Sequence, residues 1–277
     1  MTPLSEQPNR NSTLGFLARL LLPLIILGAA LFAFGSILTV VDPGEPGTLL
    51  SRSAAGVLLS LFAILLATSR FAESAGGPNQ SLGRIRFHGA GRGLGLGVAL
   101  WLTPAAVVFI VLGMFGSPLQ FVGSVAEILL VGALVALAVL LSEALPEELV
   151  FRGQLMNVLS EKFTGWWIIL IQAGLFTLFA LALRGWTGFA DLSLFVGMGI
   201  GLGYIRVITG SVWVAIGFHA AFQTGSQLLL THEVASFDGS QTLNMMALGA
   251  VPFAFAAIFV ALCAPKYPRL FTATKRP

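Results

Sequence analysis

The sequence predicts an all-α protein, a polytopic helical membrane bundle with about eight transmembrane helices. Its 277 residues are 56% hydrophobic and only 10% charged, whereas soluble proteins are about 25% charged. Mean hydropathy is +0.91, and long apolar runs recur along the chain. These observations argue against a soluble globule, a disordered chain, a nucleic-acid-binding module and a coiled coil. The single cysteine also excludes a disulfide scaffold.

Eight apolar segments can cross a bilayer, which takes about 20 residues in a helix. The first and third are the clearest, and the fifth to seventh are shorter and rich in glycine. The first is longer than the core of a signal peptide and lacks a cleavage site of small residues, so we interpret it as a retained helix. We predict one integral membrane domain over 1–277, with spans at 15–41, 54–69, 94–115, 121–142, 166–183, 189–206, 211–230 and 244–264.

The basic residues predict the orientation of the bundle. Eight spans place both termini on one side, and all of the 15 basic residues except Arg52 and Arg184 fall on that side. Because cytoplasmic loops carry an excess of Lys and Arg, we predict that both termini are cytoplasmic. The short loops favour a bacterial plasma membrane.

Glycines at alternate positions mark the sixth predicted span. Gly197, Gly199, Gly201 and Gly203 occur in FVGMGIGLGY. Overlapping pairs of small residues four positions apart allow helices to approach closely in a membrane. We therefore predict close helix packing here. A phosphate-binding loop fits poorly, because no strand precedes the glycines and no lysine follows them.

The stretch PEELVFR carries the densest group of ionisable residues. Pro146 suits the first position of a new helix, which would place Glu147 and Glu148 in a first turn at the positive end of the helix dipole. With Glu143, these acids would lie at the cytoplasmic edge of the fourth span. Glu148 and Arg152, four residues apart, can pair. One interpretation is a structural helix start with a salt bridge; the other is a partly desolvated carboxylate that acts as a general base on water.

A second polar pair lies in the seventh predicted span. His219 and Gln223 are four residues apart and project from one helix face. They can serve as polar contacts between helices, as hydrogen-bond donors to a developing oxyanion, or as part of a metal site. His88 and His232 lie in predicted loops, and we interpret both as solvated.

These residues resemble a known family. PEELVFR is similar to the EExxxR motif of the CPBP family, the membrane-embedded CAAX-prenyl-protease and bacteriocin-processing proteins. YIRVITGSVWVAIGFHAAFQ resembles its third conserved region, a Gly-Ser-hydrophobic-Trp turn followed by a helix with HxxxN. The match covers roughly 140–228, which we predict to be the CPBP-like core. It implies that Glu147 is the catalytic glutamate, that Glu148 and Arg152 hold the site in place, and that His219 is the histidine of the third region.

The resemblance implies hydrolysis of peptide bonds within or beside the membrane. In eukaryotic members the substrate is a prenylated C-terminal CAAX protein. Bacterial members are associated with peptide processing, bacteriocin immunity or regulation. The expected substrates or partners are therefore membrane-embedded or lipidated peptides and proteins in a lipid bilayer, and not nucleic acid.

Two positions depart from the family pattern. The second conserved region reads FxxxH in the family, but here Phe179 is followed four residues later by Leu183. Arg184, next to it, is always charged and replaces neither a base nor a metal ligand. Gln223 stands where asparagine is usual and is one methylene longer.

The missing histidine bears on the cofactor. The resemblance raises zinc as a cofactor, and its ligands here would be Glu147 and His219. Two strong ligands are too few for a tight zinc site, since even catalytic sites use three protein ligands. Loss of one member of a cooperating catalytic set also lowers the rate by orders of magnitude.

Three hypotheses follow for function. In the first, the chain is an intramembrane endopeptidase in which Glu147 activates water and His219 with Gln223 stabilises the oxyanion. In the second, favoured by Leu183, it is a non-catalytic pseudoprotease that acts as a membrane scaffold or binding protein. In the third, a transporter or channel, Glu127 within the fourth span marks an ion path, although no inverted repeat supports this hypothesis.

Overall fold

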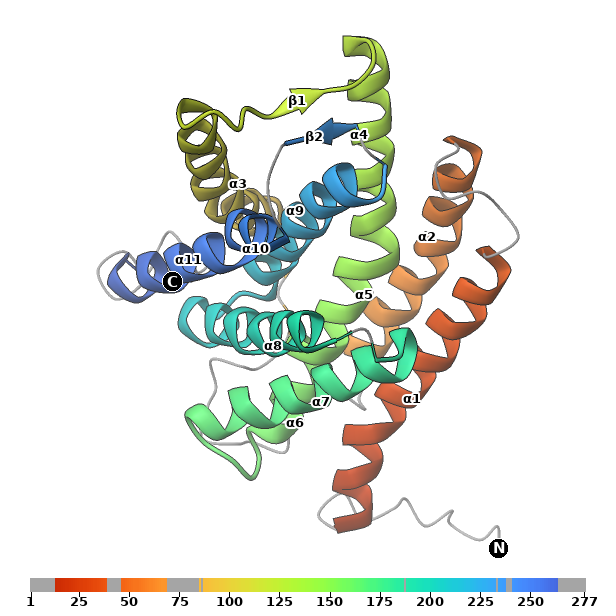
Figure 1. The fold of residues 1–277 in the computed structure, drawn as a ribbon. Coiled ribbons are helices and arrows are strands. Elements are labelled where there is room, and N and C mark those ends of the chain that lie inside the picture. The colour runs from red at the N-terminus through yellow and green to blue at the C-terminus, as the bar shows by residue number, and fades with distance from the viewer. Residues whose placement is uncertain are drawn as a thin grey trace, which may run out of the picture.

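The described chain is a helical bundle with one two-stranded antiparallel ladder (Figure 1). The computed structural model describes residues 13–38, 46–68, 85, 87–186, 188–232, 234–237 and 241–263. Its separate helices are α1 Thr13–Leu38, α2 Pro46–Thr68, α3 Ala90–Met114, α7 Trp166–Arg184, α8 Phe189–Thr209 and α9 Val212–Leu230. Two further long helices each consist of consecutive α-helical and π-helical parts. The last of them consists of α10 Gln241–Met245, a π-helical stretch η4 Met246–Ala250, and α11 Val251–Cys263.

Seven helical segments within the described residues are long and apolar enough to cross a membrane. They coincide with seven of the eight predicted spans. The remaining span, predicted at 211–230, forms α9, whose His219, Gln223 and Gln227 make it more polar than the others. The seven segments are Thr13–Ser36, Gly47–Thr68, Ala90–Met114, Val125–Leu159, Trp166–Arg184, Asp191–Thr209 and Leu243–Cys263. The predicted fold class is confirmed, and the chain is an integral membrane protein.

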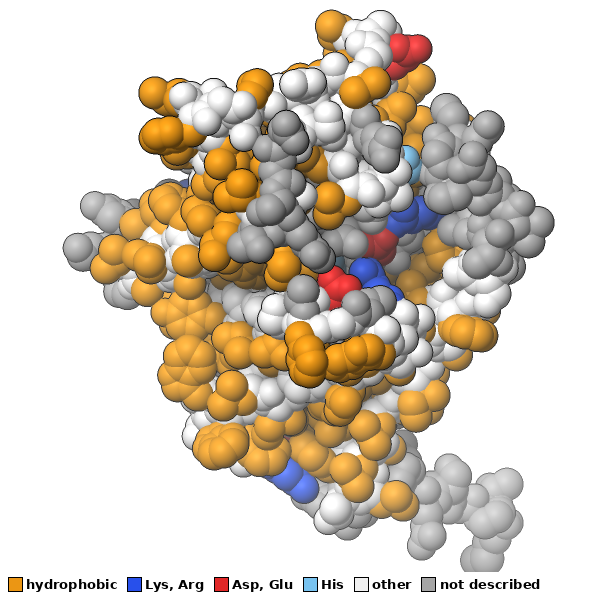
Figure 2. All heavy atoms as spheres, in the orientation of Figure 1, with side chains coloured by type: hydrophobic (Ala, Val, Ile, Leu, Met, Phe, Trp, Pro, Cys, Tyr) orange, Lys and Arg blue, Asp and Glu red, His pale blue; other side chains and the backbone are white. Residues whose placement is uncertain are grey.

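The outer surface is apolar, as a bilayer requires. Leu14 is 78% exposed, Leu58 70% and Met114 81%. Figure 2 shows apolar side chains over most of the visible face, with acidic and basic side chains gathered in a hollow near its centre.

The predicted orientation depends in part on residues outside those described. They are Arg10, Arg70, Arg84, Arg86, Lys266, Arg269, Lys275 and Arg276. The cytoplasmic placement of both termini therefore stays a prediction.

Close helix contacts are made through glycine. A Cβ built on Gly97 of α3 would lie 2.2 Å from the carbonyl oxygen of Val214, and one on Gly217 of α9 would lie 2.1 Å from that of Leu94. Neither position has room for a side chain, so the two backbones lie in direct contact. This contact fixes α9, and with it His219, against α3.

The glycines of α8 confirm the predicted close packing at three positions. A Cβ on Gly199 would lie 2.8 Å from Cα of Ala173 in α7, and one on Gly203 would lie 2.7 Å from Oε1 of Gln172. Gly201 approaches Phe253 of α11 in the same way. Gly197 has no neighbour within 4 Å and takes no part.

The ladder joins two loops at the end of the bundle where α4 (Val125–Val139) begins (Figure 1). Strand β1 (Gln120–Phe121) pairs antiparallel with β2 (Ala235–Ser236), with Gln120 opposite Ser236. The start of the fourth transmembrane helix and the end of α9 are thereby held near each other. These are the helices that carry PEELVFR and His219.

Candidate active site

The helix that carries PEELVFR does not begin at Pro146. Helical backbone continues from Val125 to Leu159. Its parts are α4 Val125–Val139, η2 Leu140–Ala144, α5 Leu145–Glu148, η3 Leu149–Leu155 and α6 Met156–Leu159. Proline has no N–H to donate, and the wider turn of η2 accommodates it: the Leu145 N–H donates to the Leu140 carbonyl, five residues back. The predicted helix start is therefore wrong, and Glu147 and Glu148 do not lie in a first turn.

The acids are not separated from the two arginines that were predicted on the other side of the membrane. The fourth span does not end at residue 142 but continues to Leu159. Glu143 pairs with Arg52, and Glu147 shares a cavity with Arg184. Those arginines were the two predicted on the opposite side from the acids. The acidic segment thus lies within the long helix, away from either end.

Glu148 is the centre of a fully buried polar network. Its Oε1 accepts from Nη1 of Arg152 at 2.7 Å and lies 2.9 Å from Nδ1 of His219. Arg152 also donates to the Met198 carbonyl at 3.2 Å and lies over the ring of Phe176 at 4.6 Å. The predicted pairing of Glu148 with Arg152 is confirmed. One carboxylate therefore ties α5 to η3 and α9.

The contact with Glu148 orients the imidazole of His219. An ionised carboxylate only accepts hydrogen bonds, so Nδ1 carries the proton in this contact. In the neutral ring, Nε2 is then left as an acceptor. His219 is itself buried. Its ring is held in one orientation and one tautomer by a carboxylate that touches it.

A small cavity of about 40 Å³ brings the other predicted residues together. Glu147, His219 and Gln223 all line it. This volume suffices for a water molecule, which needs at least about 10–15 Å³. Its other lining residues are Phe176, Phe179, Ala180, Leu183, Arg184, Leu194, Phe195 and Met198.

Leu183 lies in this cavity together with Glu147 and His219. The position where the family has histidine therefore faces the site, and here it is apolar. One nitrogen of His219 is already engaged by Glu148. No group of three or more His, Cys, Asp or Glu side chains converges among the described residues. The donor set does not fit a tightly bound zinc ion, which takes at least three protein ligands.

Comparison with known proteins assigns this region to a family. Residues 128–225 match the family model described as Type II CAAX prenyl endopeptidase Rce1-like. This segment, called the Rce1-like segment below, is similar to that family. No curated protein and no solved structure matches the chain. The matched segment contains Glu147, Glu148, Arg152, His219 and Gln223, so the resemblance to the CPBP family is confirmed over these residues, and the match supports a CAAX-protease-like membrane endopeptidase fold.

A second polar cluster lies one helical turn from the cavity. Arg52 of α2 pairs with Glu143 and donates to Oε1 of Gln227 at 3.0 Å. Gln227 in turn donates to Oε1 of Glu143 at 3.1 Å. Glu143 precedes Glu147 by four residues, and Gln227 follows Gln223 by four. The polar faces of the two Rce1-like helices thus continue beyond the site.

Sequence reasoning assigned no role to this cluster. The four-residue spacing on each helix was a signal that could have found Glu143 and Gln227. Nothing in the sequence near Arg52 linked it to them. The ion pair is partly exposed, with 18% of the Arg52 side chain and 16% of the Glu143 side chain accessible.

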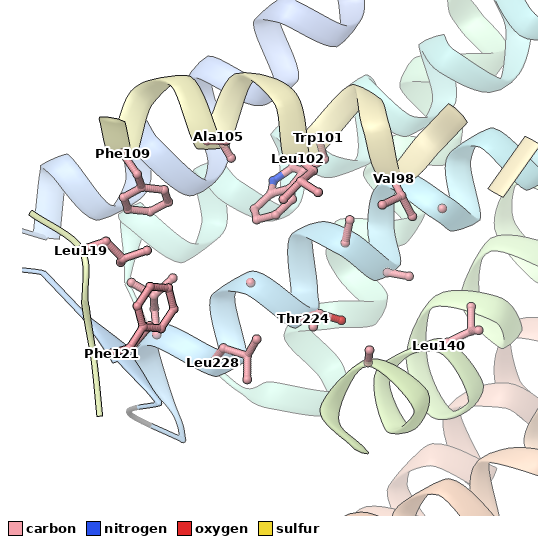
Figure 3. A pocket seen from close by; sticks show the side chains of 18 of the residues that line it. Val98, Trp101, Leu102, Ala105, Phe109, Leu119, Phe121, Leu140, Thr224 and Leu228 are labelled. Atoms are coloured by element: carbon pink, nitrogen blue, oxygen red, sulfur yellow. The ribbon is translucent and has the colours of Figure 1, made fainter. Parts of the chain in front are cut away.

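A large apolar cavity of about 710 Å³ lies on another side of α9. In Figure 3, Val98, Trp101 and Ala105 of α3 line one wall, and Thr224 and Leu228 of α9 another. Ala220 and Thr224, which follow His219 and Gln223 by one residue each, line this cavity. One helix of the Rce1-like segment therefore separates an apolar chamber from the small polar one.

Two other sequence interpretations need correction. Glu127 is exposed at the start of α4, where it forms a capping box: the Ser124 N–H donates to Oε2 of Glu127 at 2.8 Å. Its carboxylate is explained by helix capping and does not mark an ion path.

His88 is exposed, as predicted, but His232 is half-buried with a buried Nε2. The turn after α9 folds back onto that helix, since the His232 N–H donates to the Gln227 carbonyl.

Proposed function

We propose that this chain is an intramembrane endopeptidase in which Glu147 activates a water molecule for attack on a peptide bond. The observation that carries the proposal is the small cavity lined by Glu147, His219 and Gln223 inside an Rce1-like segment. A carboxylate, an oriented imidazole and an amide are suitable groups for hydrolysis of a bound carbonyl. Hydrolysis by these three groups requires no bound metal ion.

The contact with Glu148 refines the role expected for His219. With Nδ1–H directed at Glu148, Nε2 accepts a hydrogen bond from the water, and Glu147 takes the water proton. The water oxygen attacks the carbonyl carbon, and the carbonyl oxygen becomes an oxyanion that accepts from the Gln223 amide. When the C–N bond breaks, Glu147 returns the proton to the leaving amine.

The apolar cavity supports a substrate with a hydrophobic or lipidated segment. Its lining is almost entirely carbon, and Thr224 is the one hydroxyl among the residues around it. Burial of apolar area there favours binding by about 25 cal/mol per Å². A membrane peptide or a lipidated protein would place its apolar part in this cavity and its scissile bond beside Glu147.

Glutamine substitution at two glutamates tests the proposal. The purified protein in liposomes is assayed against a library of fluorescence-quenched membrane peptides. Glu147→Gln keeps shape and loses the base, so cleavage should fall by about 10²–10⁴-fold. Glu127→Gln is a matched control, because glutamine also completes a capping box. Equal cleavage by wild type and Glu147→Gln would rule the proposal out.

A second candidate is favoured by one observation, the presence of Leu183 in the site. In this alternative the chain is a pseudoprotease that holds a membrane peptide or lipidated partner in the apolar cavity without cleaving it. Wild-type protein would then bind library peptides with no turnover. Robust cleavage by the wild type, abolished by Glu147→Gln, excludes this alternative.

A further inference from the structure

Arg184 has no role in the mechanism above, yet it lines the same cavity as Glu147, His219 and Gln223. It lies at the C-terminal end of α7, next to Leu183. Its side chain is exposed, so its donors are open to a bound substrate.

Arg184 takes part in no ion pair within the described part of the chain. Its guanidinium lies 5.6 Å from the ring centre of Phe195, another residue of the cavity wall. The carboxylate of Glu147 lines the same cavity. An arginine held against the cavity wall without a counter-ion is available to an anion formed inside the cavity.

The oxyanion in this mechanism has a single donor, which is neutral. His219 presents Nε2 as an acceptor once Nδ1–H is directed at Glu148, which leaves the Gln223 amide as a single neutral donor. Leu183 contributes nothing where the family has a polar residue. A tetrahedral intermediate carries a full negative charge, and fixed donors or cations at that oxygen are usually the largest catalytic contribution.

We propose that Arg184 is a catalytic residue that donates hydrogen bonds to the oxyanion and supplies a positive charge beside Leu183. The inference rests on the proposed endopeptidase function and adds one step to it. As the water oxygen bonds to the carbonyl carbon, the π electrons move to the carbonyl oxygen, which accepts from the Arg184 guanidinium and from Gln223. Collapse of the intermediate restores the carbonyl and breaks the C–N bond, with the proton passing from Glu147 to the amine.

The kinetic test uses the full-length protein in liposomes with the library peptide that the wild type cleaves fastest. Arg184→Ala should lower kcat by about 10²-fold, the low end of the range for loss of one oxyanion donor, because the guanidinium is exposed to solvent. KM should change little, and added guanidinium should restore part of kcat. Arg184→Lys keeps the charge, so its kcat should lie between that of the wild type and that of Arg184→Ala. Arg92→Ala, an exposed arginine of α3 outside the cavity, should match the wild type.

Each outcome of these assays supports or overturns the proposed role of Arg184. An unchanged kcat for Arg184→Ala overturns the inference, and so does a rise in KM alone, which would assign Arg184 to ground-state binding of a substrate anion. The inference is supported if added guanidinium restores kcat of Arg184→Ala but leaves Glu147→Gln inactive, since a misfolded variant would not recover. If the wild type cleaves and Glu147→Gln does not, the proposed function stands whatever Arg184 does. Absence of cleavage by the wild type overturns both.

Discussion

Breaking the buried pair between Glu148 and Arg152 should destabilise the protein strongly. Both side chains have no accessible surface, so Glu148→Leu leaves a guanidinium buried without a counter-charge. Its remaining contacts are the Met198 carbonyl and the rings of Phe151 and Phe176, which do not neutralise it. Removal of one partner of a buried ion pair costs about 3–5 kcal/mol. We expect Glu148→Leu and Arg152→Met each to lower the free energy of unfolding by an amount in this range.

The double variant separates the effect of charge on the free energy of unfolding from the effect of packing. Glu148→Leu with Arg152→Met removes both charges, and replacement of a whole buried pair by apolar residues is often neutral or better. The two changes should therefore couple by at least about 3 kcal/mol, the cost of one unpaired buried charge. Cleavage should not return with stability, because Nδ1 of His219 has lost the carboxylate that orients it.

Unfolding in mixed detergent and SDS micelles, followed by circular dichroism, measures these free energies. Arg19 and Glu161 provide a matched pair: they join α1 to the turn after α6 through two hydrogen bonds of 2.7 and 2.6 Å, away from the cavity. Arg19→Met with Glu161→Leu should leave cleavage unchanged. Additive effects at Glu148 and Arg152, within about 0.5 kcal/mol, would refute the reasoning.

Three further predictions concern other parts of the chain. Leu183→His gives the cavity a third donor, so Zn²⁺ affinity measured by chelator competition should rise above that of the wild type; equal affinity would mean that position 183 does not reach Glu147 and His219. Gly97→Ala should lower the free energy of unfolding by about 1–3 kcal/mol through overpacking against α9, whereas Gly95→Ala, with no neighbour within 4 Å, should be neutral or slightly stabilising; similar losses at both sites would contradict the close contact. Burial, and then the nearby charge of Arg52, lower the pKa of His232 below its usual 6.5, so the unfolded chain takes up a proton that the folded chain resists, and the free energy of unfolding should fall as pH drops below about 6.5; His232→Gln should reduce that slope, and an unchanged slope would exclude His232 as its source.

The site residues followed from local spacing, but their roles did not. Glu148 with Arg152, and His219 with Gln223, are four residues apart, and helical periodicity places each pair on one face. Contact between Glu148 and His219 spans 71 residues, and no local pattern encodes it. The helix start at Pro146 was wrong because proline is a local signal for a boundary, whereas the π-turn that accommodates it depends on the packing around the long helix.

By itself, the amino-acid sequence determined the membrane location, the helical class and seven segments that are long and apolar enough to cross the bilayer. Hydrophobic burial in lipid acts on composition over about 20 residues, so these properties are local sums. It also determined the chemical groups of the site through motif spacing. Only the tertiary structure decided that Arg52 meets Glu143, that Arg184 and Leu183 share a cavity with Glu147, and that Glu148 orients His219. These contacts join helices far apart in sequence, and they exist because glycine contacts and a buried charge network hold the helices at fixed positions.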